Sequence, residues 1–140
     1  MKLLLPIFLF FIVSVGLAQR DQHPIDRRHD ACHNVISNQS TYGMMECESI
    51  AREEWDAEMN IYYTLLLDSL SDESGALLEQ AQKAWLEYAK KEYSFSSAFY
   101  YTDMEGTMWY VANARRQLNI VRERALELKM YFETYTGVGL

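Results

Sequence analysis

Hydrophobic positions repeat with helical spacing over most of the chain after residue 40. Neighbours three or four residues apart lie on one face of an α-helix. The first such stripe consists of Met44, Cys47, Ala51, Trp55, Met59, Tyr62, Leu66 and Leu70. Ser40 or Thr41 can supply the side-chain oxygen that caps its first turn. Residues 71–75, which are polar and end in glycine, then interrupt the pattern.

Two further stripes follow this break. The second consists of Leu77, Ala81, Trp85, Tyr88, Phe95 and Phe99, and the third of Met108, Val111, Arg115, Leu118, Val121, Ala125, Leu128 and Phe132. Residues 102–106 separate them, and no convincing segment has the alternating pattern of a strand. The sequence therefore predicts an all-α domain over residues 40–136, built as an antiparallel bundle of three long helices.

The N-terminus has the features of a secretory signal peptide. Lys2 precedes a short apolar run at residues 3–15, and small residues, Gly16 and Ala18, stand three and one positions before the expected cleavage site. A membrane span needs about 20 apolar residues, so this run is too short for an anchor. We expect residues 1–18 to be removed and the mature chain to be exported, to a periplasm or outside the cell, without membrane insertion.

Residues 19–39 are expected to form an N-terminal arm, flexible up to about residue 30 because the segment is polar, lacks a period and contains Pro24. The arm carries Cys32, and Cys47 lies in the first predicted helix. An oxidising compartment favours a disulfide between them, which the chain-entropy model values at about 3 kcal/mol. Their spacing is not that of a redox or metal motif.

Acidic residues outnumber basic ones, 20 to 13, for a net charge of −7. This balance argues against nucleic acid or anionic lipid as the main partner and is compatible with a basic protein. Residues 46–58 hold six acidic residues and residues 115–129 hold five basic ones. Either the two helices complement each other across the bundle, or the acidic face meets a basic partner.

Catalytic and metal-binding motifs find little support. His29 and His33 are four residues apart and can share a helix face, but no third ligand at helical spacing follows, and His23 lies upstream. We expect a solvated arm with a partly buried histidine beside the disulfide, and no metal or cofactor. Carboxylate pairs such as Glu53 with Asp56 are typical of an exposed helix face. No catalytic residues are assigned, and the protein is predicted not to be an enzyme.

Aromatic residues are abundant, with three tryptophans and ten tyrosines. Two clusters, residues 99–101 and 109–110, flank the second interruption of the helical pattern. Exposed aromatic side chains in such a position are good anchors for a protein partner. The alternative is that they cover the end of the bundle.

Five short motifs resemble, in the right order, those of the exported lysozyme-inhibitor LprI-like domain family, over roughly residues 32–128. They are Ser40-Thr41-x-x-Met44-x-x-Cys47, Trp55-Asp56-x-x-Met59-Asn60-x-x-Tyr63, Ala81-Gln82-Lys83-Ala84-Trp85 with Tyr88, Glu105-Gly106-Thr107-Met108, and Arg122-Glu123-Arg124 with Glu127-Leu128. Members often carry a second cysteine pair, which this chain lacks because it has only two cysteines.

Most residues shared with the family are expected to be architectural, because buried polar groups need hydrogen-bond partners on neighbouring helices. The residues in question are Met44, Asp56, Asn60, Tyr63, Gln82 and Trp85. The resemblance implies inhibition of lysozyme by some members. Our leading hypothesis is a non-enzymatic exported protein that binds another protein, with lysozyme inhibition by occlusion as the specific candidate, because the acidic net charge would attract a basic enzyme whose cleft a loop or helix end could block. The alternative is a structural or assembly module of the cell envelope without a lysozyme target. The natural target and the oligomeric state stay open.

Overall fold

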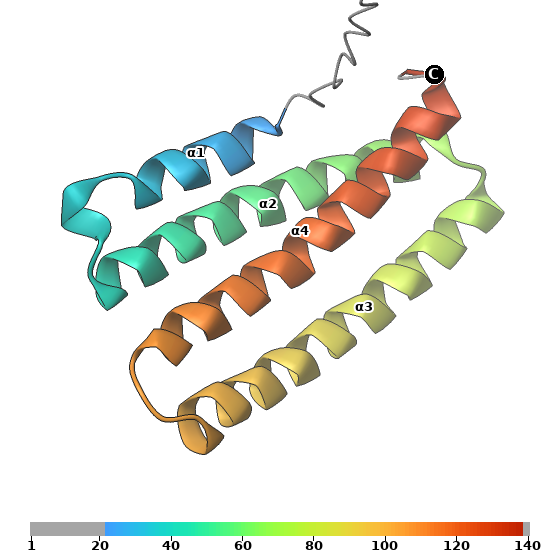
Figure 1. Ribbon diagram of the computed structural model, residues 1–140. Helices are drawn as coiled ribbons and strands as arrows, with labels where there is room; N and C mark the ends of the chain where they lie inside the picture. Colours follow the sequence, from blue (N-terminus) through green and yellow to red (C-terminus); the bar gives the residue numbers. More distant parts are fainter. Residues whose placement is uncertain (1–21, 139–140) are drawn as a thin grey trace, which may run out of the picture.

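Four α-helices make up the part of the chain that the structure, a computed structural model, describes, residues 22–138 (Figure 1). In order, the elements are α1 (Pro24–His33), the 3-10 turn η1 (Ile36–Asn38), α2 (Thr41–Ser69), α3 (Asp72–Ala98), the π-helical turn η2 (Phe99–Asp103) and α4 (Met108–Thr136). No strand occurs among these residues. The predicted signal peptide, residues 1–18, lies outside the described residues.

Serine side chains cap the starts of α2 and α3. Ser40 Oγ accepts a hydrogen bond from the backbone N–H of Gly43, at 3.1 Å, at the beginning of α2. Ser71 Oγ accepts one from Ser74, at 3.4 Å, at the beginning of α3. Both are N-caps, which pair backbone donors that the helix itself leaves unsatisfied. Gly137, with φ of 71°, ends α4 in the left-handed conformation that glycine adopts without strain.

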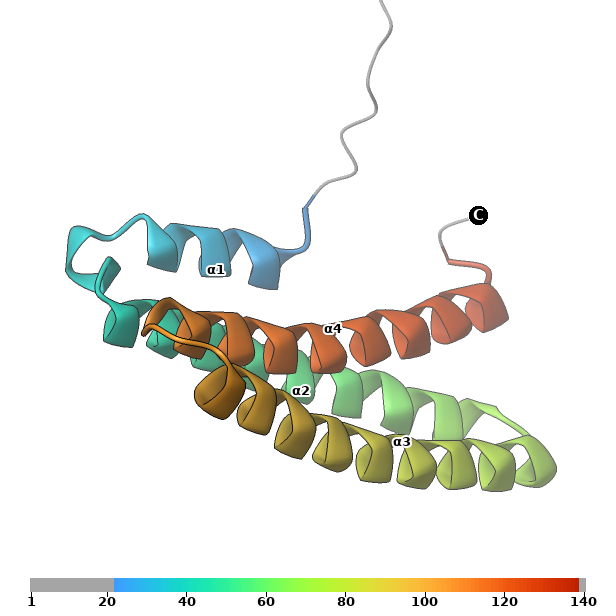
Figure 2. The same ribbon diagram turned by 60° about the horizontal axis from the view of Figure 1, so that its bottom comes forward.

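The core lies between α2 and α4, which pack against each other along their length and run in the same direction (Figure 1). α1 and α3 lie on opposite sides of this pair, as Figure 2 shows. The predicted stripes on α2 and α4 supply most of the buried apolar side chains, which are Ile25, Ala51, Trp55, Met59, Leu66, Leu118, Val121, Ala125 and Leu128. The all-α class and the long helices are therefore confirmed.

The expected count of three helices is wrong, because the segment predicted as a flexible arm contains α1. Pro24 occupies the first turn, where its missing N–H costs nothing, and Asp26 complements the helix dipole there. His23 Nδ1 accepts a hydrogen bond from Ile25 N, at 3.3 Å, in place of the usual serine cap. Ile25 is the one residue of α1 that is fully buried. The helix therefore has no stripe of apolar residues from which it could be predicted.

The stripe predicted for α3 is also largely wrong. Its buried residues are Gln82, Ala89 and Ser96, seven positions apart. The fully buried residues of α3 are therefore small or polar, while Leu78, Trp85 and Tyr93 pack against the core only partly buried, and α3 contacts α2 and α4 sparsely. Most of the expected apolar stripe faces outward, with exposed fractions of 61% for Leu77 and 63% for Phe95. The spacing of apolar residues did not identify the buried face of α3, because this helix covers the core with only part of its apolar surface.

Candidate functional site

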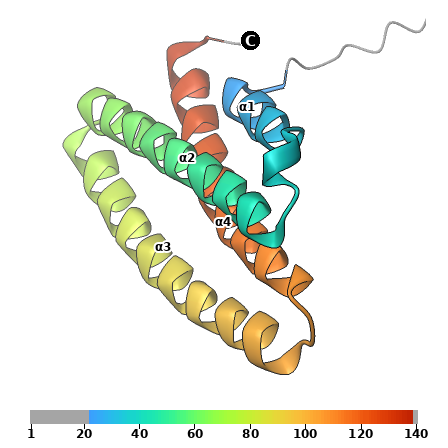
Figure 3. The ribbon, with the colours of Figure 1, turned by 90° about the vertical axis from the view of Figure 1, so that its left-hand side faces the viewer.

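Large apolar side chains gather on the surface where α3 turns into α4, a region we call the aromatic end. Its members are Phe95, Phe99, Tyr101, Met108 and Tyr110, which are between 38% and 67% exposed. Two acidic residues, Asp103 and Glu105, lie exposed in the same turn. Figure 3 shows this turn at one end of the bundle, beyond the N-terminal end of α2 and far from the last turn of α4. Apolar residues so placed are typical of a protein-binding surface.

The rings of the aromatic end contact each other in pairs. Phe95 stacks on Phe99 with ring centres 6.2 Å apart, and Tyr101 meets Tyr110 edge to face at 5.0 Å. The buried amide of Asn113 donates a hydrogen bond to the Tyr101 hydroxyl at 2.8 Å. Aromatic pairs at these separations are attractive, so the side chains are held in place before any partner arrives.

Interhelical charge pairs explain much of the uneven charge. On α4, Arg115 binds Glu48 of α2, Arg116 binds Glu92 of α3 and Arg122 binds Asp26 of α1, with Nη2 to carboxylate distances of 2.6 to 2.8 Å. The basic residues of α4 thus form ion pairs with acidic residues of α1, α2 and α3, and not of α2 alone. On α2, Glu46, Glu53 and Asp56 are exposed and make no ion pair within residues 22–138, which leaves an acidic surface.

The pKa of Asp26 reflects its position between α1 and α4. Burial acts to raise the pKa of this carboxyl, but the hydrogen bond and charge of Arg122 outweigh burial, with smaller contributions from Trp55 and His23. The pKa of Asp26 is therefore below its ordinary value. The carboxylate stays ionised at neutral pH and links α1 to α4.

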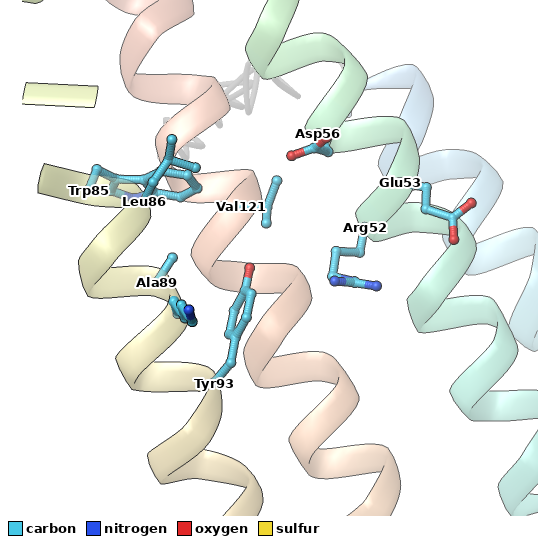
Figure 4. A pocket seen from close by; sticks show the side chains of 9 residues that line it. Arg52, Glu53, Asp56, Trp85, Leu86, Ala89, Tyr93 and Val121 are labelled. Atoms are coloured by element: carbon cyan, nitrogen blue, oxygen red, sulfur yellow. The ribbon is translucent and has the colours of Figure 1, made fainter. Parts of the chain in front are cut away.

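A shallow groove of about 420 Å³ runs between α2, α3 and α4 (Figure 4). Arg52, Glu53 and Asp56 line one side, and Trp85, Leu86, Ala89, Lys90 and Tyr93 line the other, with Val121 between them. Burial raises the pKa of the Tyr93 hydroxyl, although the Arg52 charge opposes it. Since the groove is open to solvent and holds side chains of both charges, it can accept a protruding polar segment of a partner, but it does not form an enclosed substrate cavity.

The residues shared with the family occupy different environments. Gln82 is buried and accepts a hydrogen bond from Arg124 Nε of α4 at 2.9 Å. Asp56 and Asn60 are exposed, and the Asn60 amide donates to the Asp56 backbone carbonyl at 2.9 Å, within α2 and not across to another helix. Met44, Tyr63 and Trp85 are half-buried, and the latter two pack against the core.

The disulfide between Cys32 and Cys47 is present, with Cα atoms 5.8 Å apart, and links α1 to α2. Beside it lies a cluster that the sequence did not reveal. Glu48 is fully buried on α2, and its carboxylate contacts His29, His33 and Arg115. Glu48 could not be found from spacing, because its partners lie on other helices.

The Glu48 carboxylate is ionised. Burial acts to raise its pKa, but the close contact and charge of His29 and the hydrogen bonds and charge of Arg115 outweigh burial and bring the pKa below its ordinary value. Its Oε1 atom accepts hydrogen bonds from Arg115 Nε at 2.9 Å and Nη2 at 2.7 Å. A buried carboxylate requires such partners to remain charged.

Fold and surface together define a class, a disulfide-linked helical domain with exposed aromatic side chains at one end and exposed carboxylates on α2. No helix within residues 22–138 is long and apolar enough to cross a bilayer. The family model described as "Lysozyme inhibitor LprI" matches residues 32–128. The chain belongs to this family, as its motifs predicted, and membership in a lysozyme-inhibitor family implies an exported protein.

The fold also resembles a solved structure of an uncharacterised protein from Burkholderia thailandensis, with a TM-score of 0.77 and 31% sequence identity. The match covers 83% of this chain and 57% of that one, so this chain spans little more than half the length of that protein. No curated protein matches the sequence. The solved structure therefore supports the fold without adding an activity.

Proposed function

We propose that this protein is a non-enzymatic inhibitor that binds a lysozyme-type muramidase and blocks its substrate cleft with the aromatic end. The observation that carries the proposal is the cluster of exposed, mutually packed aromatic side chains in a member of a lysozyme-inhibitor family. An inhibitor that acts by occlusion needs a projecting surface, and the turn between α3 and α4 lies at one end of the molecule.

Preorganisation favours this surface as the contact. Partner binding usually costs free energy because it immobilises side chains at the interface. Here the pairs Phe95–Phe99 and Tyr101–Tyr110 are already in contact, so less conformational freedom is lost. Aromatic side chains also dominate the binding energy of many protein interfaces.

Charge supports the same partner. The net charge of −7 attracts a basic enzyme over a distance of about one Debye length, which raises the association rate more than the final affinity. The exposed carboxylates of Asp103 and Glu105 bring negative charge to the aromatic end itself. Association is therefore expected to slow as salt is added.

The test is inhibition of muramidase turnover of cell-wall substrate by the oxidised chain 19–140. The double variant Phe95→Ala/Met108→Ala removes the two most exposed members of the aromatic end. We expect its inhibition constant to rise about 30-fold or more, since truncating an important interface residue costs more than about 1 kcal/mol, the two truncations together cost about 2 kcal/mol, and each 1.4 kcal/mol is tenfold.

The matched control is Leu77→Ala/Ile61→Ala, which truncates two equally exposed apolar side chains elsewhere, 61% and 54% exposed. It should inhibit like the wild type. Unchanged turnover at micromolar wild-type protein and low salt would refute the proposal and favour the alternative, an envelope assembly module. If both double variants lost inhibition equally, the aromatic end would not be the specific contact, and this part of the proposal would be wrong.

A further inference from the structure

We infer that His29, His33 and Glu48 form a binding site for one divalent first-row transition metal ion, for which zinc is the best fit. The three residues offer ligand atoms that all lie within 4.8 Å of one another. This site is separate from the aromatic end and does not depend on the inhibitor function.

The geometry places the ligand atoms at the spacing of a metal's coordination shell. His29 Nε2 lies 3.1 Å from His33 Nε2 and 3.0 Å from Glu48 Oε2, and His33 Nε2 lies 3.2 Å from Glu48 Oε1. In a tetrahedral zinc site, ligand bonds of 2.0–2.1 Å put neighbouring ligand atoms about 3.3 Å apart. These separations are close to those of a coordination shell, and binding one ion requires the two histidines, which now approach different oxygens of Glu48, to meet it together.

Protein hydrogen bonds leave part of this cluster unsatisfied. Glu48 Oε2 is buried and has no hydrogen-bond partner among the protein groups, although His29 Nε2 lies 3.0 Å away. The two Nε2 atoms also face each other, and a neutral imidazole carries only one N–H. A cation between them would use the lone pairs of both rings and of Oε2 at once.

Arg115 fixes the carboxylate without occupying the whole of it. Both of its hydrogen bonds end on Oε1, at 2.7 and 2.9 Å, and leave Oε2 free to bind a metal. Outer-shell partners of this kind orient ligands in metal sites. The positive charge of Arg115 opposes a dication and limits the affinity.

The disulfide holds the two halves of the site together. Cys32 lies between the two histidines on α1, and its partner Cys47 directly precedes Glu48 on α2. The histidines, four residues apart on one helix, share a face that meets α2 at this point. The ligands are therefore brought together by a covalent link before any metal binds, which lowers the entropy cost of binding.

The ligand set selects the class of ion. Two imidazole nitrogens and one carboxylate suit zinc and its transition-metal neighbours, whereas calcium and magnesium prefer oxygen ligands. The histidine side chains are 15% and 21% exposed, so an ion can enter and a water molecule can complete the tetrahedron.

The test is Zn²⁺ binding to untagged, oxidised protein by calorimetry and by competition with a chromogenic chelator. We expect one ion per chain, and at zinc a hundredfold above Kd the midpoint of thermal unfolding should rise by about 10 °C. Glu48→Gln and His29→Gln should each weaken binding at least about 100-fold, beyond the effect of losing an outer-shell partner. The matched control is His23→Gln, which removes the histidine outside the cluster and should leave the affinity unchanged.

A measurement on the wild type guards against variants that fail to fold. Nitrogen resonances of the imidazole rings should shift on adding Zn²⁺ for Nε2 of His29 and His33 and not for His23. Absence of stoichiometric binding, or shifts confined to His23, would overturn the inference. Calcium at the same concentration should produce neither the shifts nor the rise in melting temperature.

Discussion

Replacing Gly43 by alanine should lower the free energy of unfolding, because the new methyl group would collide with the backbone of η1. Gly43 lies in the first turn of α2, directly against η1. A Cβ atom built there would lie 2.5 Å from Asn38 Cα and 2.8 Å from Asn38 O. Because these are backbone atoms, no side-chain rotation relieves the clash, and η1 must move away from α2.

The magnitude follows from two opposing effects. Overpacking a well-packed site costs about 1–3 kcal/mol, and contact with backbone favours the upper end. Gly to Ala in a helix gains about 1 kcal/mol, so the net loss is about 2 kcal/mol. Gly75 offers a control in the first turns of α3, where the nearest atom to a new Cβ is Leu67 Cδ2 at 3.8 Å. Gly75→Ala should therefore stabilise by about 0.5–1 kcal/mol.

Urea unfolding of both oxidised variants, followed by circular dichroism, measures these changes. The two midpoints should move in opposite directions, with free energies of unfolding separated by about 3 kcal/mol, the sum of the two effects. If Gly43→Ala were as stable as Gly75→Ala, the close approach of η1 to α2 would be wrong. A change of slope in Gly43→Ala alone would instead indicate that η1 has detached before global unfolding.

Two further predictions concern charge and the core. Asp26→Asn should destabilise the protein at neutral pH, and this difference should shrink as the pH falls below the ordinary carboxyl pKa toward the lowered pKa of Asp26, because a carboxyl with a depressed pKa stabilises the fold only while ionised. Urea unfolding from pH 7 to pH 2 measures this, and a difference that stays constant or grows as the pH falls would contradict it. Leu128→Ala should lower the free energy of unfolding by about 2–5 kcal/mol, since Leu128 is 0% exposed. Leu77→Ala, at 61% exposure, should change it by no more than about 0.5 kcal/mol. Equal losses in the two variants in urea unfolding would mean that the core is misplaced.

Helices α2 and α4 could be predicted because each buries a continuous apolar stripe against the other. Trp55, Met59 and Leu66 on α2 and Leu118 and Leu128 on α4 fall where the three-to-four residue period places them. The disulfide could be predicted from the cysteine count and from the export that the predicted signal peptide implies. Local pattern suffices for such elements because the same residues determine both the helix and its buried face.

Helices α1 and α3 show where that logic fails. α1 buries only Ile25 and is held by the disulfide and by the ion pair of Asp26 with Arg122, neither of which leaves a periodic signal. α3 has the expected period, but its fully buried residues, such as Gln82 and Ala89, are polar or small, and Trp85 of the predicted stripe is only partly buried. Which face of a helix is buried depends on how much surface its neighbours can cover.

The sequence by itself determined the family, the helical class, the pairing of the cysteines and the main core, because these rest on residue identity and short spacings. Only the tertiary structure decided that Glu48 meets His29 and His33, and that the aromatic residues beside η2 stay exposed. Both results depend on groups that are distant in the chain and close in space. Spacing along one helix cannot report such a contact, since the packing of separate helices creates it.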